Sequence, residues 1–313
     1  MIISASRRTD IPNYYSEWFF NRIRDGFLYV RNPVNPHQIS DIDLSPGAVD
    51  CIVFWTKNPG PMLGRLDELS GYHYYFQFTL TGYGTDIECY VPHKRKVMIP
   101  VFKQLSGEIG RQRVIWRYDP ILFTHRYTPE YHIKAFGQIA ASLEGYTDKC
   151  VISFVDLYAK NKKSMSALNS YDLDESRLMA FVEKLAQIGR KHGIGIASCA
   201  EKLDLQKYGI RHNCCIDKDL IERITACPIH VLKDKNQRLE CGCAESVEIG
   251  AYNTCKNGCR YCYANGSGLR VENTCRTYNP HSPLLCGEVG EGDKISKRKV
   301  KSVRDQQLSL KVE

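Results

Sequence analysis

The sequence predicts an α/β fold in which parallel strands form a partial or complete (β/α)6, TIM-like barrel. Short apolar or β-branched segments alternate with amphipathic segments through the first 200 residues. Strands separated by helices pair in parallel, with crossovers of one hand. Several of the apolar segments are almost continuous, as in strands covered on both faces. A doubly wound open sheet would have the same periodicity and stays an alternative.

The elements are expected in alternating order along the chain. Six strands are expected at Met1–Ser6, Asp50–Thr56, Tyr72–Thr81, Arg113–Tyr118, Lys149–Asp156 and Gly193–Cys199. Helices are expected between them at Asn13–Arg24, Pro61–Leu69, Pro92–Leu105, Pro129–Leu143 and Asp174–His192. A proline in or just before the first turn favours the start of a helix, and Gly193 favours the end of the last one.

Composition limits the class of protein. The 313 residues carry a formal charge of +8, and no apolar run approaches the roughly 18 residues of a membrane span. The first residues lack the apolar region of a signal peptide, so a cytoplasmic protein is expected. Part of the positive charge lies in one run over residues 294–304. Such a run is usually a solvated face, although it would also suit nucleic acid.

The cysteines are unevenly distributed. Eleven of the fourteen lie between Cys199 and Cys286. Without a secretory signal these thiols are expected to stay reduced, and packing alone gives no reason for the gradient. The sequence therefore predicts a cysteine-rich, metal-binding region over residues 201–313, packed on the mouth of a barrel formed by residues 1–200.

Charged or hydrogen-bonding residues follow every expected strand. In barrels of this kind the active site lies at the carboxyl ends of the strands. Polar strand ends also simply meet solvent, but charged groups at these ends exceed what loops need. The candidate site residues at the strand ends are Arg7, Arg8, Asp10, Lys57, Asn58, Arg117, Asp119, Asp156 and Glu201.

Three cysteines lie close together near the end of the chain. Cys255, Cys259 and Cys262 have the spacing C-x3-C-x2-C, and Tyr261 precedes the third. Three thiolates at this spacing suit three irons of a 4Fe–4S cluster and leave the fourth iron open. Gly258 permits the tight loop that such a cluster needs. Structural zinc is the alternative, but zinc requires a fourth ligand, either Cys275 or His281.

A second group of cysteines precedes these three. Cys199, Cys215, Cys241 and Cys243 are expected to converge on one closed site. Four thiolates would suit an auxiliary iron–sulfur cluster or a structural zinc ion. Buried, unliganded thiols are the remaining alternative, because free cysteine is often buried.

The cysteine spacing is similar to the signature of radical S-adenosylmethionine (SAM) enzymes, which also have a full or partial barrel of parallel strands. In those enzymes the cysteine loop normally follows the first strand, whereas here it follows the sixth. This departure resembles an uncharacterised bacterial family whose C-terminal cysteines have been likened to the radical SAM cluster. The resemblance covers almost the whole chain and is carried by residues 3–12, 53–59, 116–121 and 252–265.

The resemblance implies a radical SAM-type enzyme with an unknown substrate. Cys255, Cys259 and Cys262 would hold the cluster, SAM would bind its open iron, and Tyr261 would lie beside the adenine. An electron from a donor such as a flavodoxin or ferredoxin would cleave SAM to methionine and a 5′-deoxyadenosyl radical. The SAM carboxylate would suit a basic side chain, and its ammonium and ribose an acidic or polar one. These candidates are Arg7, Arg8, Lys57 and Arg117, and Asp10, Asn58, Asp119, Asp156 and Glu201.

A second function remains open. The cysteines and the basic run would also suit a metal-stabilised protein that binds nucleic acid or transfers electrons without SAM chemistry. This alternative does not explain why charged residues follow all six strands. Salt-dependent nucleic-acid binding, with zinc as the metal, would favour it.

Overall fold

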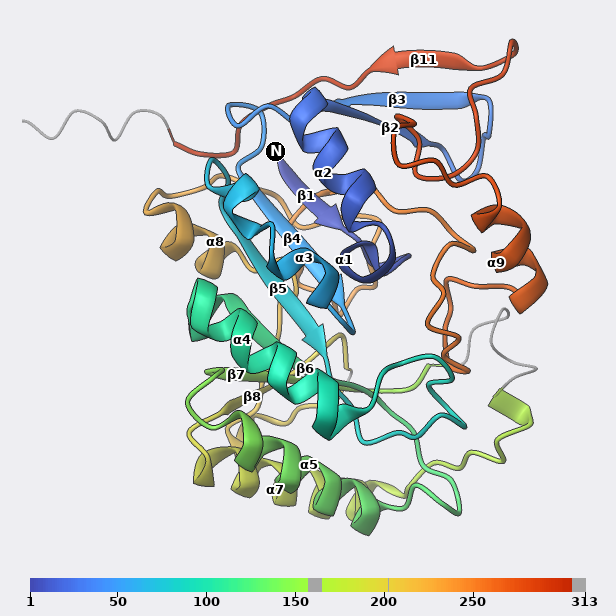
Figure 1. The fold of residues 1–313 in the computed structure, drawn as a ribbon. Helices are drawn as coiled ribbons and strands as arrows, with labels where there is room; N and C mark the ends of the chain where they lie inside the picture. The colour runs from blue at the N-terminus through green and yellow to red at the C-terminus, as the bar shows by residue number, and fades with distance from the viewer. Residues whose placement is uncertain (157–164, 202, 306–313) are drawn as a thin grey trace, which may run out of the picture.

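The computed structural model describes residues 1–156, 165–201 and 203–305. Within these ranges, eight strands form one large sheet in which every neighbouring pair is parallel (Figure 1). Their order across the sheet is β10-β1-β4-β5-β6-β7-β8-β9. The α/β class and the parallel pairing that the sequence predicts are therefore confirmed.

All six expected strands are present in the large sheet. They are β1 (Ile2–Ala5), β4 (Cys51–Thr56), β5 (Tyr74–Thr79), β6 (Val114–Ile121), β7 (Lys149–Phe154) and β8 (Gly195–Ser198). Two short strands that the sequence analysis did not anticipate extend the sheet at its edges, β9 (Arg211–His212) and β10 (Val247–Glu248). Residues beyond position 200 thus form part of this sheet.

The strand order distinguishes between the architectures that periodicity left open. From β1 to β9 the order follows the chain without reversal, whereas a doubly wound sheet reverses direction at a switch point. Only β10 is added on the other side of β1. The edge strands β9 and β10 do not pair with each other within the described residues, so the sheet is open there and a closed barrel is not formed.

Helices follow the strands in the expected order, but the one expected at Pro61–Leu69 is divided into a short α-helix and a 3-10 helix at Leu66–Leu69, and the two after residue 200 were not expected. The α-helices are α1 (Ile11–Tyr14), α2 (Ser16–Asp25), α3 (Gly60–Leu63), α4 (Ile99–Ile109), α5 (Pro129–Leu143), α7 (Glu175–Lys191), α8 (Lys218–Thr225) and α9 (Gly268–Cys275). The sequence predicts α5 to the residue, because Thr128 caps the Tyr131 N–H and Pro129 occupies the first helical position. A single helix was expected at residues 13–24. The structure divides this segment at Tyr15 into α1 and α2.

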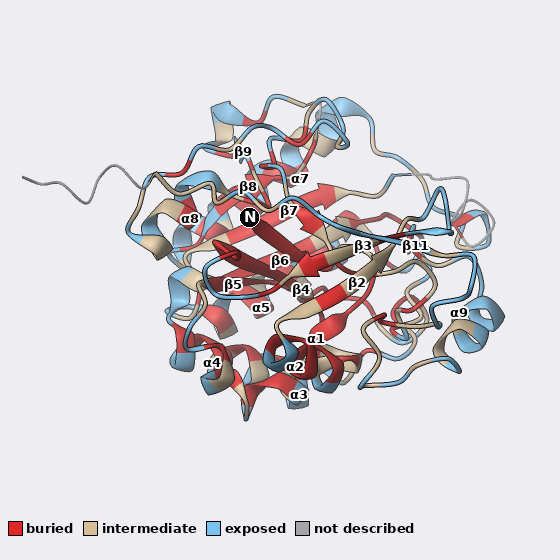
Figure 2. Cartoon of the chain, turned by 90° about the horizontal axis from the view of Figure 1, so that it is seen from above, coloured by how far each residue is buried: buried red, intermediate tan, exposed pale blue. Residues whose placement is uncertain are grey.

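The two faces of the large sheet are covered by different parts of the chain. Alternate residues of a strand point to opposite faces, and β4 shows the division. Ile52 and Phe54 pack in the core beneath the helices, whereas Cys51 and Val53 pack against Ile216 and Ile221 of the C-terminal region. Figure 2 shows these buried strands inside an outer layer that includes α2, α3 and α4.

A separate three-stranded sheet lies beside the large one. It contains β2 (Phe27–Arg31), β3 (Gln38–Asp43) and β11 (Lys294–Lys297), with β3 in the middle. β11 carries part of the basic run, and its four residues are exposed. Among the described residues, no helix is both long and apolar enough to cross a membrane.

Candidate functional site

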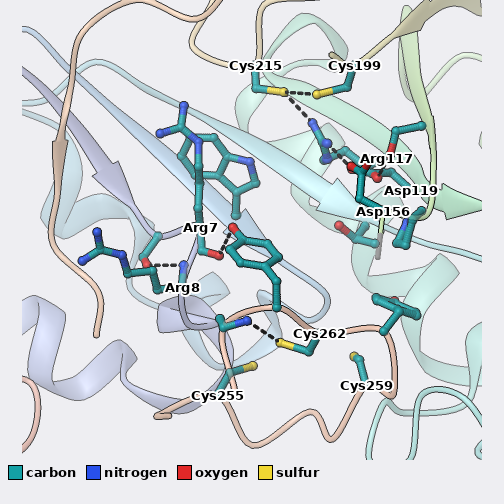
Figure 3. A pocket seen from close by; sticks show the side chains of 18 of the residues that line it. Arg7, Arg8, Arg117, Asp119, Asp156, Cys199, Cys215, Cys255, Cys259 and Cys262 are labelled. Carbon is teal, nitrogen blue, oxygen red and sulfur yellow. Dashed lines mark hydrogen bonds and ion pairs between the residues drawn. The ribbon is translucent and has the colours of Figure 1, made fainter. Parts of the chain in front are cut away.

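A cavity of about 700 Å³ lies at the carboxyl ends of the parallel strands. This is the edge of a parallel α/β sheet where ligands bind. Most of the candidate residues line it: Arg7, Arg8, Asp10, Lys57, Arg117, Asp119, Asp156, Cys199, Cys215, Cys241, Cys243, Cys255, Cys259, Tyr261 and Cys262. Figure 3 shows Cys255, Cys259 and Cys262 along one edge of this pocket and Cys199 and Cys215 along the opposite edge.

Cys255, Cys259 and Cys262, hereafter the cysteine trio, lie on one short loop. Gly258 in this loop has φ +65°, in the left-handed region that favours glycine. A Cβ atom at this position would also lie 2.7 Å from Cδ2 of Tyr90, so no larger residue fits without movement. Burial raises the pKa of Cys255 to about 12. A positively charged metal centre would reverse that shift, because it stabilises the thiolate.

The trio loop is fixed to the first strands of the sheet through Asn257. The amide of Asn257 donates to Oδ2 of Asp10 (2.9 Å), and its Oδ1 accepts from Tyr14 (3.1 Å). Asp10 also accepts from the hydroxyl of Thr56 (2.6 Å) and the backbone N–H of Lys57 (2.8 Å). With these partners the buried carboxylate is saturated, so Asp10 joins β1, β4 and the trio loop at one point.

A buried ion cluster supports the tyrosine of the trio loop. Glu88 has no exposed side-chain surface and pairs with Lys57 (2.6 Å between Nζ and Oε1) and with Lys94. Tyr261 donates its hydroxyl to the same carboxylate, and Thr81 donates a further hydrogen bond. Burial alone would raise the pKa of Glu88, but the two lysines lower it to about 2. The carboxylate is therefore ionised and holds the ring of Tyr261 at the cavity wall.

Two arginines follow β1 and extend along the cavity. The Arg7 guanidinium lies 4.8 Å from the centre of the Trp55 ring, and that of Arg8 lies 4.6 Å from the ring of Tyr252. The Arg7 carbonyl accepts from the hydroxyl of Tyr263, which ties this segment to the trio loop. Nη2 of Arg7 is buried and has no hydrogen-bond partner within the described ranges. A buried cationic N–H without a partner is costly, so an acceptor is expected here.

Cys199, Cys215, Cys241 and Cys243, hereafter the cysteine quartet, come from three separate segments. The Sγ atoms of Cys199 and Cys215 are 3.3 Å apart. The Sγ of Cys243 accepts from the backbone N–H of Cys215 (3.2 Å), and Cys241 lines the same cavity two residues before Cys243. The structure therefore brings together the four thiols that the sequence analysis grouped.

Arg117 is the charged residue closest to the quartet. Its Nη1 lies 2.8 Å from Sγ of Cys215, and its Nη2 pairs with Asp119. Hydrogen bonds from Cys199 and Cys243, followed by the charges of Arg117 and Arg7, lower the pKa of Cys215 well below its ordinary value. These neighbours therefore favour the thiolate form of Cys215, and the hydrogen bond from Cys243 also lowers the pKa of Cys241, to about 6.

Two candidate residues are not among those that line the cavity, and a third is already paired. Asn58 lies in the turn after β4, where its side chain bonds to Asn13 and accepts from the Gly60 N–H. Glu201 accepts from the backbone N–H of Phe154 (2.8 Å), and burial raises its pKa to about 7. Asp156 lines the cavity but forms an ion pair with Arg238. A position after a strand does not by itself fix where the side chain points.

The residues that the sequence analysis missed mainly hold other residues of the site in place. Glu88 lies in a loop without periodicity, and nothing near it in the sequence indicates that two lysines will surround it. Asn257 had a usable signal, because the Asn-Gly pair between the first two cysteines of the trio is typical of a tight turn. Trp55 and Tyr263 could have been anticipated as aromatic neighbours of the charged strand end and the trio.

Within the described residues, no three His, Cys, Asp or Glu side chains are arranged to hold a single metal ion. A cluster makes a different demand, because each thiolate binds its own iron and the thiols do not share one centre. The donor set of the trio fits such a cluster, because three thiols on one loop line the cavity.

Comparison with known proteins gives a family but no activity. No match is found among curated proteins. A crystal structure described as "a putative alpha-L-fucosidase from Bacteroides thetaiotaomicron" is 13% identical, covering 58% of this chain and 74% of that one. Its TM-score of 0.25 is too low to carry an argument. The family model described as "Domain of unknown function (DUF1848)" matches residues 2–264, which include both cysteine groups, and the chain belongs to this family.

Proposed function

We propose that this protein is a radical SAM-type enzyme that carries a 4Fe–4S cluster on the cysteine trio and acts on a substrate bound in the cavity. The observation that carries the proposal is the shared cavity: the three thiols and Tyr261 line the same space as Arg7, the other charged strand ends and the aromatic rings beside them. The open parallel sheet, with strands from β1 to β9 in chain order, is compatible with the partial barrel that the proposal requires.

The chain's own residues would position the loop and exclude water. Asp10 and Asn257 hold the loop against β1 and β4, and Glu88 fixes the ring of Tyr261. A bound cluster with an open iron would supply the electron that cleaves SAM to methionine and a 5′-deoxyadenosyl radical. Trp55 and Tyr263 line the cavity and would shield it from solvent.

Contacts in the site narrow the candidates for SAM binding. Lys57 is committed to Glu88, and Arg117 to Asp119 and Cys215. The guanidinium of Arg8 forms no carboxylate pair among the described residues, and its backbone adjoins the segment tied to Tyr263. Arg7 likewise forms no carboxylate pair there, so Arg7 and Arg8 are our two candidates for the SAM carboxylate, which a planar guanidinium can bind through two hydrogen bonds.

The nucleic-acid alternative gains no support from the site. The basic residues of β11 do not line the cavity. Arg304, at the end of the run, pairs with the buried Asp50 (2.9 Å), so that part of the positive charge is structural.

The test is reductive cleavage of SAM by protein reconstituted anaerobically with iron and sulfide. We expect 5′-deoxyadenosine from the wild type and none from Cys259→Ala. Cys89→Ala is the matched control, because Cys89 lies beside Gly258 but is not among the residues that line the cavity. Equal cleavage by Cys259→Ala and Cys89→Ala would contradict the role of the trio.

A further inference from the structure

The cysteine quartet forms a second thiol-rich wall that the proposed SAM chemistry does not use. All four of its residues line the cavity, and Cys215, Cys241 and Cys243 are buried. They belong to segments far apart in the sequence: Cys199 follows β8, Cys215 follows β9, and Cys241 and Cys243 precede β10. Three segments thus deliver thiols to one place.

The chain passes close to another cysteine segment at Gly242. A Cβ atom on Gly242 would lie 2.6 Å from Sγ of Cys214, so the chain passes close to the Cys214–Cys215 segment at this point. The close passage brings Cys243 beneath two backbone donors. Its Sγ accepts from the N–H groups of Cys215 (3.2 Å) and Ile216 (3.4 Å).

Further donors surround Cys215. Nδ2 of Asn213 lies 3.4 Å from its sulfur, in addition to Nη1 of Arg117 at 2.8 Å. N–H groups directed at sulfur are the environment of cluster-ligating thiolates, whose reduction potential they tune. A wall of neutral, unliganded thiols would not require so many donors.

The charged residues at this wall also indicate a negatively charged centre on the quartet. Arg117 is buried at this wall and Arg7 is half-buried, and Asp119 is the carboxylate paired with Arg117. Nη2 of Arg7 is buried and has no hydrogen-bond partner among the described residues. Buried cations require nearby negative charge, and four thiolates around a metal cluster carry it.

We propose that Cys199, Cys215, Cys241 and Cys243 ligate a second iron–sulfur cluster, with all four positions closed by protein, on the cavity wall opposite the trio. The contact between Cys199 and Cys215 would open as iron enters, since each thiolate then binds a different iron. Any substrate in the cavity would lie between the two centres.

The test separates this site from the trio. In Cys255→Ala/Cys259→Ala/Cys262→Ala, anaerobic reconstitution should leave roughly four irons and four sulfides per chain, with a visible charge-transfer absorbance. Adding Cys199→Ala and Cys243→Ala to this variant should remove the bound iron and sulfide together with the absorbance. Cys214→Ala in the trio-deficient background is the matched control and should keep the iron, because Cys214 adjoins Cys215 but does not line the cavity.

Two results would overturn the proposal: a folded trio-deficient variant that binds no iron, or one that binds only zinc. If that variant does not fold, the wild type and Cys199→Ala/Cys243→Ala give the answer. We expect roughly eight irons in the wild type and roughly four in the double variant, and equal iron in both would contradict the second cluster. Failure of SAM cleavage in the wild type leaves these iron counts unaffected, so the two proposals fail separately.

Discussion

The two cysteine walls of the cavity are built in opposite ways. The trio lies on one loop of eight residues, from Cys255 to Cys262, and its spacing can be seen in the sequence. The quartet is drawn from three segments between Cys199 and Cys243 and exists only through the tertiary fold. Yet the compact loop depends on distant supports, because Asp10 and Glu88 hold it.

The difference shows that ligand spacing and ligand support are separate properties. A short motif supplies three thiols at the right separation, but its loop is positioned by residues far away in the chain. The quartet has no motif, and its donors are mainly local: the backbone N–H groups of Cys215 and Ile216, and the neighbouring Asn213. The following substitutions test whether the two walls respond independently.

The largest effect is expected from Glu88→Gln. This change leaves Lys57 and Lys94 as buried cations without their carboxylate, which should lower the free energy of unfolding by about 3–5 kcal/mol. Urea denaturation of the metal-free chain measures it. Glu272→Gln is the control, because Glu272 is exposed in a helical pair with Arg276 and should change stability by less than about 1 kcal/mol. Equal effects of the two substitutions would show that the ion cluster does not support the trio loop.

The two glycines should respond differently to alanine. Gly258→Ala places a side chain at φ +65° and should cost about 1–2 kcal/mol of unfolding free energy from backbone strain alone. Gly242→Ala should be destabilised by the contact with Cys214. Adding Cys214→Ala to Gly242→Ala should therefore recover the lost free energy of unfolding. Adding Tyr90→Ala to Gly258→Ala should recover only part of it, because the backbone strain remains. The free energies of unfolding of the four variants check this, and full rescue at both glycines would contradict the distinction.

The smallest effect is expected from Arg117→Lys. Lysine keeps a positive charge beside Asp119 but loses the N–H that lies 2.8 Å from Sγ of Cys215. Loss of a donor to sulfur should make the reduction potential of the quartet centre more negative, with no loss of iron. A redox titration followed by electron paramagnetic resonance measures the shift. The trio signal should not move, and a shift confined to the trio would reverse our assignment of Arg117.

The fold was largely predictable from local pattern. The strands of the large sheet were found because they are apolar on both faces, and α5 because Thr128 and Pro129 mark its start. The small sheet was missed because β3 pairs with β11 across some 250 residues, a contact that no local window contains. The edge strand β10 was missed for the same reason, because it pairs with β1, whereas β9 was missed because it is only two residues long.

The sequence predicted which residues carry the chemistry of the candidate site but not which residues hold them in place. Most of the residues that the cysteine spacing and the charged strand ends identified line the cavity. Asn58 and Glu201 are not among the residues that line the cavity, and their side chains form hydrogen bonds with Asn13 and Phe154 instead. Glu88 was missed because its role comes from two lysines that only the fold brings to it.

Formation of 5′-deoxyadenosine by the anaerobically reconstituted, reduced wild type tests the central claim most directly. Our account predicts that SAM is cleaved to 5′-deoxyadenosine and methionine, in an amount that depends on the trio thiols. Protein that holds its full complement of iron and sulfide, is fully reduced, and still returns all of its SAM intact would contradict the account.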